Sequence, residues 1–112
     1  MSKMISILLE FSMFPISEDC IEGISVSKYV AKIIDAIDRS KVKYQLTPMG
    51  TIIETGSLKE ALNIVELAYE QVKDCERLYG SLKFDIRHGK SDRLKSKIES
   101  VEKRIGRVIN KS

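Results

Sequence analysis

The sequence predicts an α+β fold in which a four-stranded antiparallel sheet carries two helices on one face and is followed by a C-terminal helix. Two observations support this fold class. Apolar residues alternate with a period of two in the first and last strand-like segments, and they recur with helical spacing in three other segments. The order of segments is strand, helix, strand, strand, helix, strand, helix, which is a split βαβ arrangement with a terminal helix.

Length and composition favour one domain over residues 1–112. A chain of this length buries roughly two-thirds of its unfolded surface when it folds as one unit. Apolar residues make up 43% and charged residues 31%, which is typical of a globular protein rather than a disordered one. The 19 basic and 16 acidic side chains are interspersed for most of the length, so the net charge of +3 gives little reason to expect nucleic acid as a partner.

The N-terminal apolar run indicates a strand rather than a targeting segment. It extends only from Ile5 to Leu9, is followed by Glu10 and lacks a small-residue cleavage signal. No segment has transmembrane length, so we expect a cytoplasmic protein that does not associate with membranes. Cys20 and Cys75 are too few for a disulfide framework and lack metal-ligand spacing, and we expect two inert thiols.

Residues 4–13 form the predicted first strand. One phase is apolar and should be buried: Ile5, Ile7, Leu9, Phe11 and Met13. The other phase is mixed and should belong to an open sheet face that a partner or a ligand covers: Ser6, Leu8, Glu10 and Ser12. Residues 14–24 contain Pro15 and Gly23 and should form a long loop.

Two helices should pack on the buried face of the sheet. Ser25 can act as the N-cap of the first helix, whose apolar residues follow helical spacing: Val26, Val30, Ile33, Ile34 and Ile37. Ser57 and Glu60 have the spacing of a capping box for the second helix, whose apolar face holds Leu58, Ala61, Leu62, Val65, Ala68, Tyr69 and Val72. We expect the helices to end near residues 39–41 and 74–76.

The last strand should precede the C-terminal helix. Residues 77–87 alternate cleanly and predict a half-buried strand, with Leu78, Gly80, Leu82, Phe84 and Ile86 in its buried phase. Ser91 or Asp92 can cap the terminal helix, and Gly106 should weaken its last turns. The apolar residues of this helix form a narrow seam that could pack on the sheet or on another subunit: Leu94, Ile98, Val101, Ile105 and Val108.

A hairpin near the middle of the chain is predicted to carry a binding site. Pro48 fixes its own φ and pushes Thr47 into an extended conformation, while Gly50 can take a positive φ. Thr47, Thr51 and Glu54 bring two hydroxyls and a carboxylate close to this turn. A plain hairpin does not need so many polar groups, so we predict that they contact a ligand.

Five segments spread over nearly the whole chain carry a resemblance to a known family: Phe14-Pro15, Ser25 to Ala31, Tyr44 to Glu54, Asp85 to Arg87 and Lys97 to Val101. The specific part is the run Pro-Met-Gly-Thr followed by glutamate at the spacing of Glu54. Together these segments resemble the small thiamine-binding proteins, which were long catalogued as an uncharacterised family of bacteria, archaea and yeast. The resemblance implies a ferredoxin-like fold, assembly into dimers or tetramers, and binding of thiamine or its pyrimidine portion without known catalysis.

Thiamine is a cation with an aminopyrimidine, so its site needs a carboxylate, hydrogen-bonding groups and an aromatic or apolar wall. We expect Glu54 to supply the carboxylate and the threonines of the hairpin to supply hydroxyls. Phe14, Tyr29 or Met49 would form the wall. The free N–H groups at the helix start near Ser25 could receive a phosphate or a pyrimidine acceptor.

These residues also have ordinary structural explanations. Glu54 could be a solvated or salt-bridged residue at a strand end, and Ser25 could be a simple N-cap. Half-buried core packing is the more common fate of a tyrosine placed like Tyr29. Glu10 is on the predicted open face, where a pair with Lys83 of another subunit explains it at least as well as a ligand contact does.

Other classes of function find less support in the sequence. An RNA-recognition module needs exposed aromatic residues on its central strands, whereas Phe11 and Phe84 fall in the predicted buried phases. His88 is the only histidine, and an acyl-phosphate hydrolase would need an arginine in the first loop, so we expect no enzyme, no metal and no cofactor. The alternative to ligand binding is an oligomeric regulatory or scaffold module whose open sheet face serves subunit assembly.

Overall fold

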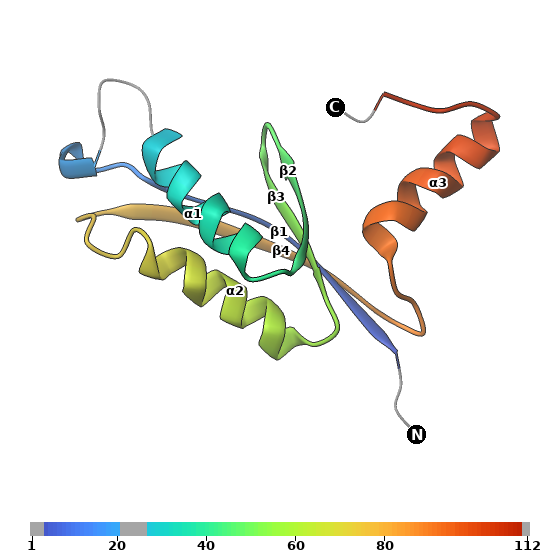
Figure 1. Cartoon of the computed structure of the whole chain (residues 1–112), viewed down its shortest axis with the longest axis horizontal. Helices are drawn as coiled ribbons and strands as arrows, with labels where there is room; N and C mark the ends of the chain where they lie inside the picture. Colours follow the sequence, from blue (N-terminus) through green and yellow to red (C-terminus); the bar gives the residue numbers. More distant parts are fainter. Residues whose placement is uncertain (1–3, 21–26, 111–112) are drawn as a thin grey trace.

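The computed structural model describes residues 4–20 and 27–110 and confirms the predicted α+β architecture (Figure 1). The sheet is antiparallel, with strand order β2-β3-β1-β4. The elements along the chain are β1 (Ile5–Pro15), a 3-10 turn η1 (Glu18–Cys20), α1 (Ser27–Arg39), β2 (Lys43–Thr47), β3 (Gly50–Thr55), α2 (Leu58–Glu70), β4 (Leu78–His88) and α3 (Arg93–Ile105).

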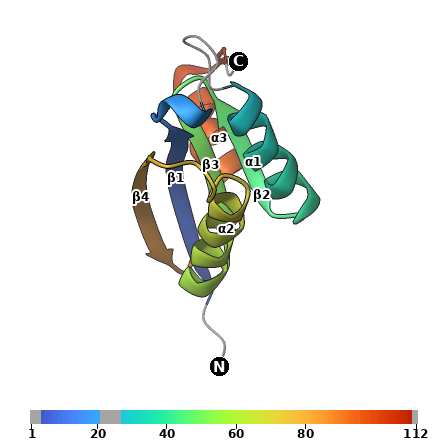
Figure 2. The ribbon, with the colours of Figure 1, turned by 90° about the vertical axis from the view of Figure 1, so that its left-hand side faces the viewer.

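The core lies between the sheet and the two helices α1 and α2, which cover one face, while α3 lies behind the sheet (Figure 2). The apolar phase of β1 is buried as predicted, since Ile7, Leu9 and Phe11 are at most 3% exposed. The opposite phase is not open along its whole length, because Ser6 is 1% and Leu8 9% exposed. The reason is that the start of α3 packs on this end of the face.

The central hairpin forms as predicted, but its glycine serves a different purpose. Gly50 is not among the glycines with a positive φ in the described part of the chain. Instead, a Cβ at this position would lie 3.1 Å from the carbonyl oxygen of Phe11, which is tighter than ordinary contact. Glycine therefore lets the hairpin approach β1 closely.

The last strand contradicts the expectation of a half-buried strand. β4 is at the edge of the sheet, and residues 79–88 are all exposed. Leu82, Phe84 and Ile86 face the helices, because they pair with the buried residues of β1, yet they remain 45%, 37% and 49% exposed. α2 packs mainly over β1 and β3 rather than over this edge (Figure 2). Phe84 is partly exposed, but it is on an edge strand and faces the helix side, so it does not supply the exposed aromatic residue on a central strand that an RNA-recognition module needs.

The second helix is shorter than predicted. Ser57 is its N-cap, and the Ser57 hydroxyl accepts the N–H of Glu60 at 3.1 Å, as expected from the capping box. The buried residues are Ala61, Ile64 and Ala68. Three residues assigned to the buried face are instead 44–48% exposed, because the stripe that meets the sheet is rotated toward Ile64: Leu58, Leu62 and Tyr69.

α3 extends away from the rest of the molecule (Figure 1). The radius of gyration is 15.9 Å, whereas a compact domain of this size has a value of about 13 Å. Gly106 ends the helix in the left-handed conformation, with φ 76°, rather than weakening its interior. Neither this helix nor any other among the described residues is long and apolar enough to cross a membrane.

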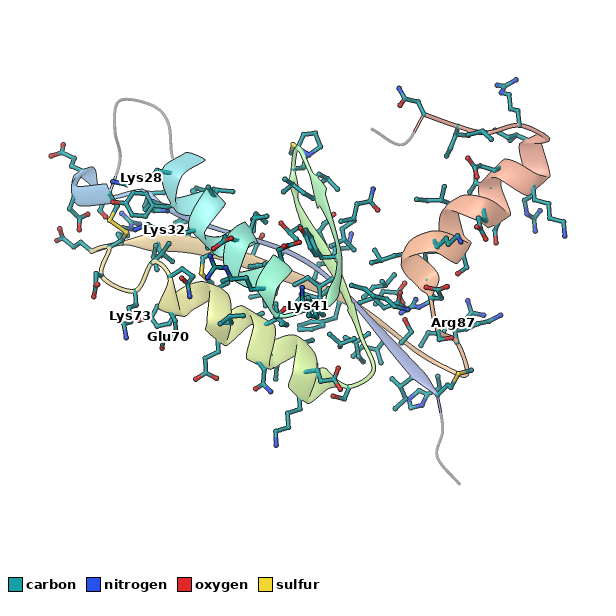
Figure 3. The ribbon with its side chains drawn as sticks, in the orientation of Figure 1. Lys28, Lys32, Lys41, Glu70, Lys73 and Arg87 are labelled. Atoms are coloured by element: carbon teal, nitrogen blue, oxygen red, sulfur yellow. A yellow bond between two sulfur atoms is a disulfide. The ribbon has the colours of Figure 1, made fainter. Side chains whose placement is uncertain are left out.

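The expectation of two inert thiols is wrong, because Cys20 and Cys75 form a disulfide (Figure 3). The two residues are 55 positions apart in the chain, and their Cα atoms are 5.7 Å apart. The cause is topological. β1 and β4 are antiparallel neighbours, so the segment that follows β1 meets the segment that precedes β4 at one end of the sheet.

Candidate functional site

A cavity of about 280 Å³ lies between α1 and the tip of the β2–β3 hairpin. The C-terminal end of β1 forms its third side. Its lining is mostly apolar, and none of the described charged residues contributes to it: Phe11, Ser12, Met13, Phe14, Val30, Ile33, Ile34, Leu46, Thr47, Pro48, Met49, Gly50 and Thr51. The cavity therefore offers a neutral, apolar environment with a few hydroxyl and backbone groups.

Four of the predicted ligand-binding residues meet at this cavity, namely Phe14, Thr47, Met49 and Thr51. Thr51 is buried, whereas Met49 at the hairpin tip is 88% exposed. The Thr47 hydroxyl donates to the carbonyl of Gly50 at 2.7 Å and accepts the N–H of Met49 at 3.3 Å. It therefore holds the turn and keeps one acceptor position for a ligand.

Tyr29 does not line the cavity. It packs partly buried against the core beside the cavity, which is the ordinary structural role of such a tyrosine. The ammonium groups of Lys28 and Lys32 lie 5.8 and 5.4 Å from its ring centroid, near the start of α1 (Figure 3). Ser25 lies outside the described residues.

Glu54 points to the other face of the sheet. Its carboxylate accepts hydrogen bonds from the Ser6 hydroxyl at 2.6 Å, the Arg93 N–H at 2.9 Å and the Leu94 N–H at 3.1 Å. The last two donors are the first free N–H groups of α3. Asp92 precedes them with φ 57° and makes no side-chain cap, so Glu54 supplies the cap from a distant strand.

The protonation of Glu54 reflects this environment. Burial favours the neutral acid, but the hydrogen bonds from Ser6, Arg93 and Leu94 favour the carboxylate and outweigh burial, so the pKa of Glu54 is lowered. The Lys43 ammonium acts in the same direction. A charged Glu54 therefore holds α3 on the sheet at neutral pH.

The sequence matches the family model described as thiamine-binding protein over residues 9–102. This chain belongs to the thiamine-binding protein family. A UPF0045 protein of Methanothermobacter thermautotrophicus is 36% identical over 83 residues, which are 72% of this chain and 84% of the relative. The UPF0045 protein YqgV of Bacillus subtilis is 40% identical over 87 residues, or 72% of this chain and 83% of that protein.

Solved structures support the fold of the thiamine-binding family for this chain. The crystal structure of a hypothetical protein from Methanocaldococcus jannaschii superposes with a TM-score of 0.71 at 32% identity, covering 86% of this chain and 95% of that one. A domain of unknown function from Bacillus cereus gives a TM-score of 0.67 at 26% identity, covering 83% and 88%. The ferredoxin-like fold implied by the resemblance is therefore confirmed.

The contribution of α1 to the cavity of this family member does not follow from the sequence. Val30, Ile33 and Ile34 belong to a helical apolar stripe, but nothing in the local sequence shows that the first turns of this stripe face a cavity rather than the core. Among the described residues, no cluster of three or more His, Cys, Asp or Glu side chains could hold a metal ion.

Proposed function

We propose that this chain binds thiamine or a thiamine-related aminopyrimidine in the cavity between α1 and the hairpin tip, without catalysing a reaction on it. The observation that carries the proposal is the meeting of Thr47, Met49 and Thr51 of the family-specific segment at one apolar cavity. Membership of the thiamine-binding family supports the choice of ligand.

The size and neutrality of the cavity suggest which part of the ligand enters. Ligand sites for molecules of drug size have volumes of roughly 300–1,000 Å³, and this cavity measures about 280 Å³. Burying the thiazolium cation without a carboxylate would carry a large desolvation cost. We therefore place the aminopyrimidine inside and the thiazolium at the exposed mouth near Met49.

The lining also supports binding without chemistry. A general acid or base must lie within hydrogen-bond reach of the reacting group. None of the residues that line the cavity has a carboxyl, imidazole, thiol or amino side chain. The hydroxyls of Thr47 and Thr51 have no such neighbour in the lining that could activate them.

Calorimetry with three probes tests the proposal: thiamine, thiamine diphosphate and the free aminopyrimidine alcohol. We expect thiamine and the aminopyrimidine to bind with similar affinities, because both place the same ring in the cavity. Val30→Trp should fill the cavity and weaken binding by about tenfold or more. Lys32→Trp is the control, because this residue is exposed on the same helix and does not line the cavity. No heat and no thermal shift with any probe at millimolar concentration would refute the proposal.

We also propose that the chain assembles into dimers or tetramers. Two apolar surfaces support assembly. One is the exposed apolar face of β4, formed by Leu82, Phe84 and Ile86, and the other is the outer half of α3. On α3, Val101 and Ile105 are 48% and 46% exposed, and Val108, which follows the helix, is 75% exposed. They continue the seam whose first residues, Leu94 and Ile98, line a cavity between α3 and the sheet. Monomers rarely expose apolar patches of this kind without a partner.

Light scattering tests the assembly. We expect the wild-type mass to be a multiple of 12.7 kDa and the Ile105→Glu variant to shift toward 12.7 kDa, because a carboxylate on the seam would be desolvated at the interface. Lys103→Glu, an exposed position on the same helix, is the control. A monomeric wild type would contradict the proposal. Assembly without any binding of the three probes would favour the scaffold function.

A further inference from the structure

We propose that the Cys20–Cys75 disulfide is a reversible thiol–disulfide exchange site that controls the order of the cavity wall formed by residues 12–14. The effect on the wall follows from the fold alone. The effect on ligand affinity rests on the proposed function.

The wall is a part of β1 that pairs with only one other strand. β1 pairs with β3 only from Ile7 to Phe11, opposite Thr55 to Thr51. Beyond Phe11, residues 12–15 pair only with β4, opposite residues 78–81. β4 is itself an edge strand with exposed side chains. Three residues of the cavity lining, Ser12, Met13 and Phe14, therefore lie on the end of a two-stranded ribbon.

The disulfide closes the open end of this ribbon. Past the last pair, the Ile16 N–H donates to the Arg77 carbonyl at 3.0 Å, and the Arg77 N–H donates to the Ser17 hydroxyl at 3.1 Å. The Glu76 N–H donates to the Asp19 carboxylate at 3.0 Å. These contacts lie at the surface, where a hydrogen bond contributes little net stability. The Cys20–Cys75 disulfide lies beyond these hydrogen bonds and is the strongest connection between the two segments.

The disulfide is at the end of the core. Both cysteines are 7% exposed and belong to the core cluster, and Cys20 is the last residue of the 3-10 turn that begins at Glu18. Glu18, Asp19 and the neighbours of Cys75, Asp74 and Glu76, are exposed. Local opening of this turn would move Cys20 out of the core cluster at a lower free-energy cost than global unfolding. In this proposal, a reductant reaches the sulfur atoms through that opening.

The exchange needs a dithiol as the reductant. Its thiolate attacks one sulfur, breaks the S–S bond and forms a mixed disulfide, and its second thiol then displaces the remaining cysteine. The protein disulfide gains two electrons and two protons to become two thiols, and the dithiol becomes a cyclic disulfide. In a reducing compartment, disulfides are usually transient or redox-sensing, which fits a site of this kind.

Hydrogen exchange of the wild-type protein tests the effect on the wall, with dithiothreitol as the reductant. Thiol titration should find no free thiol in the oxidised protein and two after reduction. Reduction should speed exchange of the amides of residues 12–14, 16 and 17 by about tenfold or more. Amides of residues 5–10, in the same strand but paired on both sides along most of that range, are the internal control. Equal protection in both states, or two free thiols after oxidation, would overturn the proposal.

Calorimetry with thiamine tests the effect on the ligand. If the reduced wall holds its binding geometry for one-fifth of the time, affinity should fall about fivefold. The Cys20→Ala/Cys75→Ala variant should have the thiamine affinity of the reduced protein, and an oxidant should not change it. Equal thiamine affinities of the oxidised and reduced wild type would refute the proposal that the disulfide controls binding. If the oxidised protein does not bind thiamine, the proposed function fails. The hydrogen-exchange result then still tests whether the disulfide orders residues 12–14.

Discussion

Replacing Arg93 with alanine should lower the free energy of unfolding by about 3 kcal/mol and release α3 from the sheet. The side chain is 3% exposed. Its Nε donates to the Ser6 hydroxyl at 2.9 Å, and its Nη2 donates to the backbone carbonyls of Ser6 and Asp85 at 2.8 and 2.6 Å. With alanine, the Ser6 acceptors would lose their donor if they stayed buried under α3, which is the costly way to lose a hydrogen bond, so release of α3 is the less costly outcome.

Urea unfolding measures the loss, and far-UV circular dichroism shows whether α3 melts separately. Arg93→Lys should recover only part of the stability, because one ammonium cannot reproduce the fork of donors that spans two strands. Lys95→Ala is the matched control: it lies on the same helix, and its ion pair with Glu99 is exposed, so its effect should be within about 0.5 kcal/mol. A loss below 1 kcal/mol for Arg93→Ala would mean that α3 is held mainly by other contacts.

Much of the fold follows from local patterns in the sequence. Period-two alternation identified β1, Pro48 identified the hairpin, and Ser57 identified the start of α2, because each of these signals acts within a few residues. The burial of β4 did not follow. Alternation shows which side chains share a face, but whether a helix covers that face depends on strand order. β4 is at an edge of the sheet, while α2 packs mainly over β1 and β3.

The site was predictable only in part, for the same reason. Thr51 and Glu54 were grouped by closeness in sequence, yet residues three apart on a strand point to opposite faces. The register shows this, because Thr51 pairs with buried Phe11 on the helix side and Glu54 pairs with Leu8 on the other side. The carboxylate of Glu54 bonds instead to the start of α3, where Arg93 lies 39 residues further along the chain.

The disulfide illustrates the same limit. Nothing around Cys20 or Cys75 marks either residue as half of a pair. The split βαβ order makes β1 and β4 neighbours, and the two segments meet only after the whole sheet has formed. Prediction of such a pair needs the topology first and the end of each strand to within a residue or two, which is the least certain part of a boundary assignment.

Replacing Glu54 with glutamine should lower the free energy of unfolding at neutral pH by about 2 kcal/mol. The amide keeps one acceptor oxygen but turns an NH₂ group toward donors, and it lacks the charge that favours the N-terminus of α3. Urea unfolding measures the change. Glu66→Gln, at an exposed position on α2, is the control and should have a small effect. Thiamine affinity should stay within about twofold, because Glu54 does not line the cavity.

The pH dependence identifies the charge as the cause. The folded pKa of Glu54 is lowered, so its stabilising contribution is fully present above the ordinary value of 4.5 and is lost as the pH falls through the folded value. The pKa of Asp85 is also lowered, mainly by its hydrogen bond with Lys97, and the pKa of Asp19 is lowered mainly by its hydrogen bond with Ser17, so the acid sensitivity of the wild type does not come from Glu54 alone. The difference between wild type and Glu54→Gln isolates Glu54, since both aspartates are common to the two proteins. This difference should shrink below pH 4.5. A difference that stays constant with pH would mean that shape, and not the charged cap, holds α3 on the sheet.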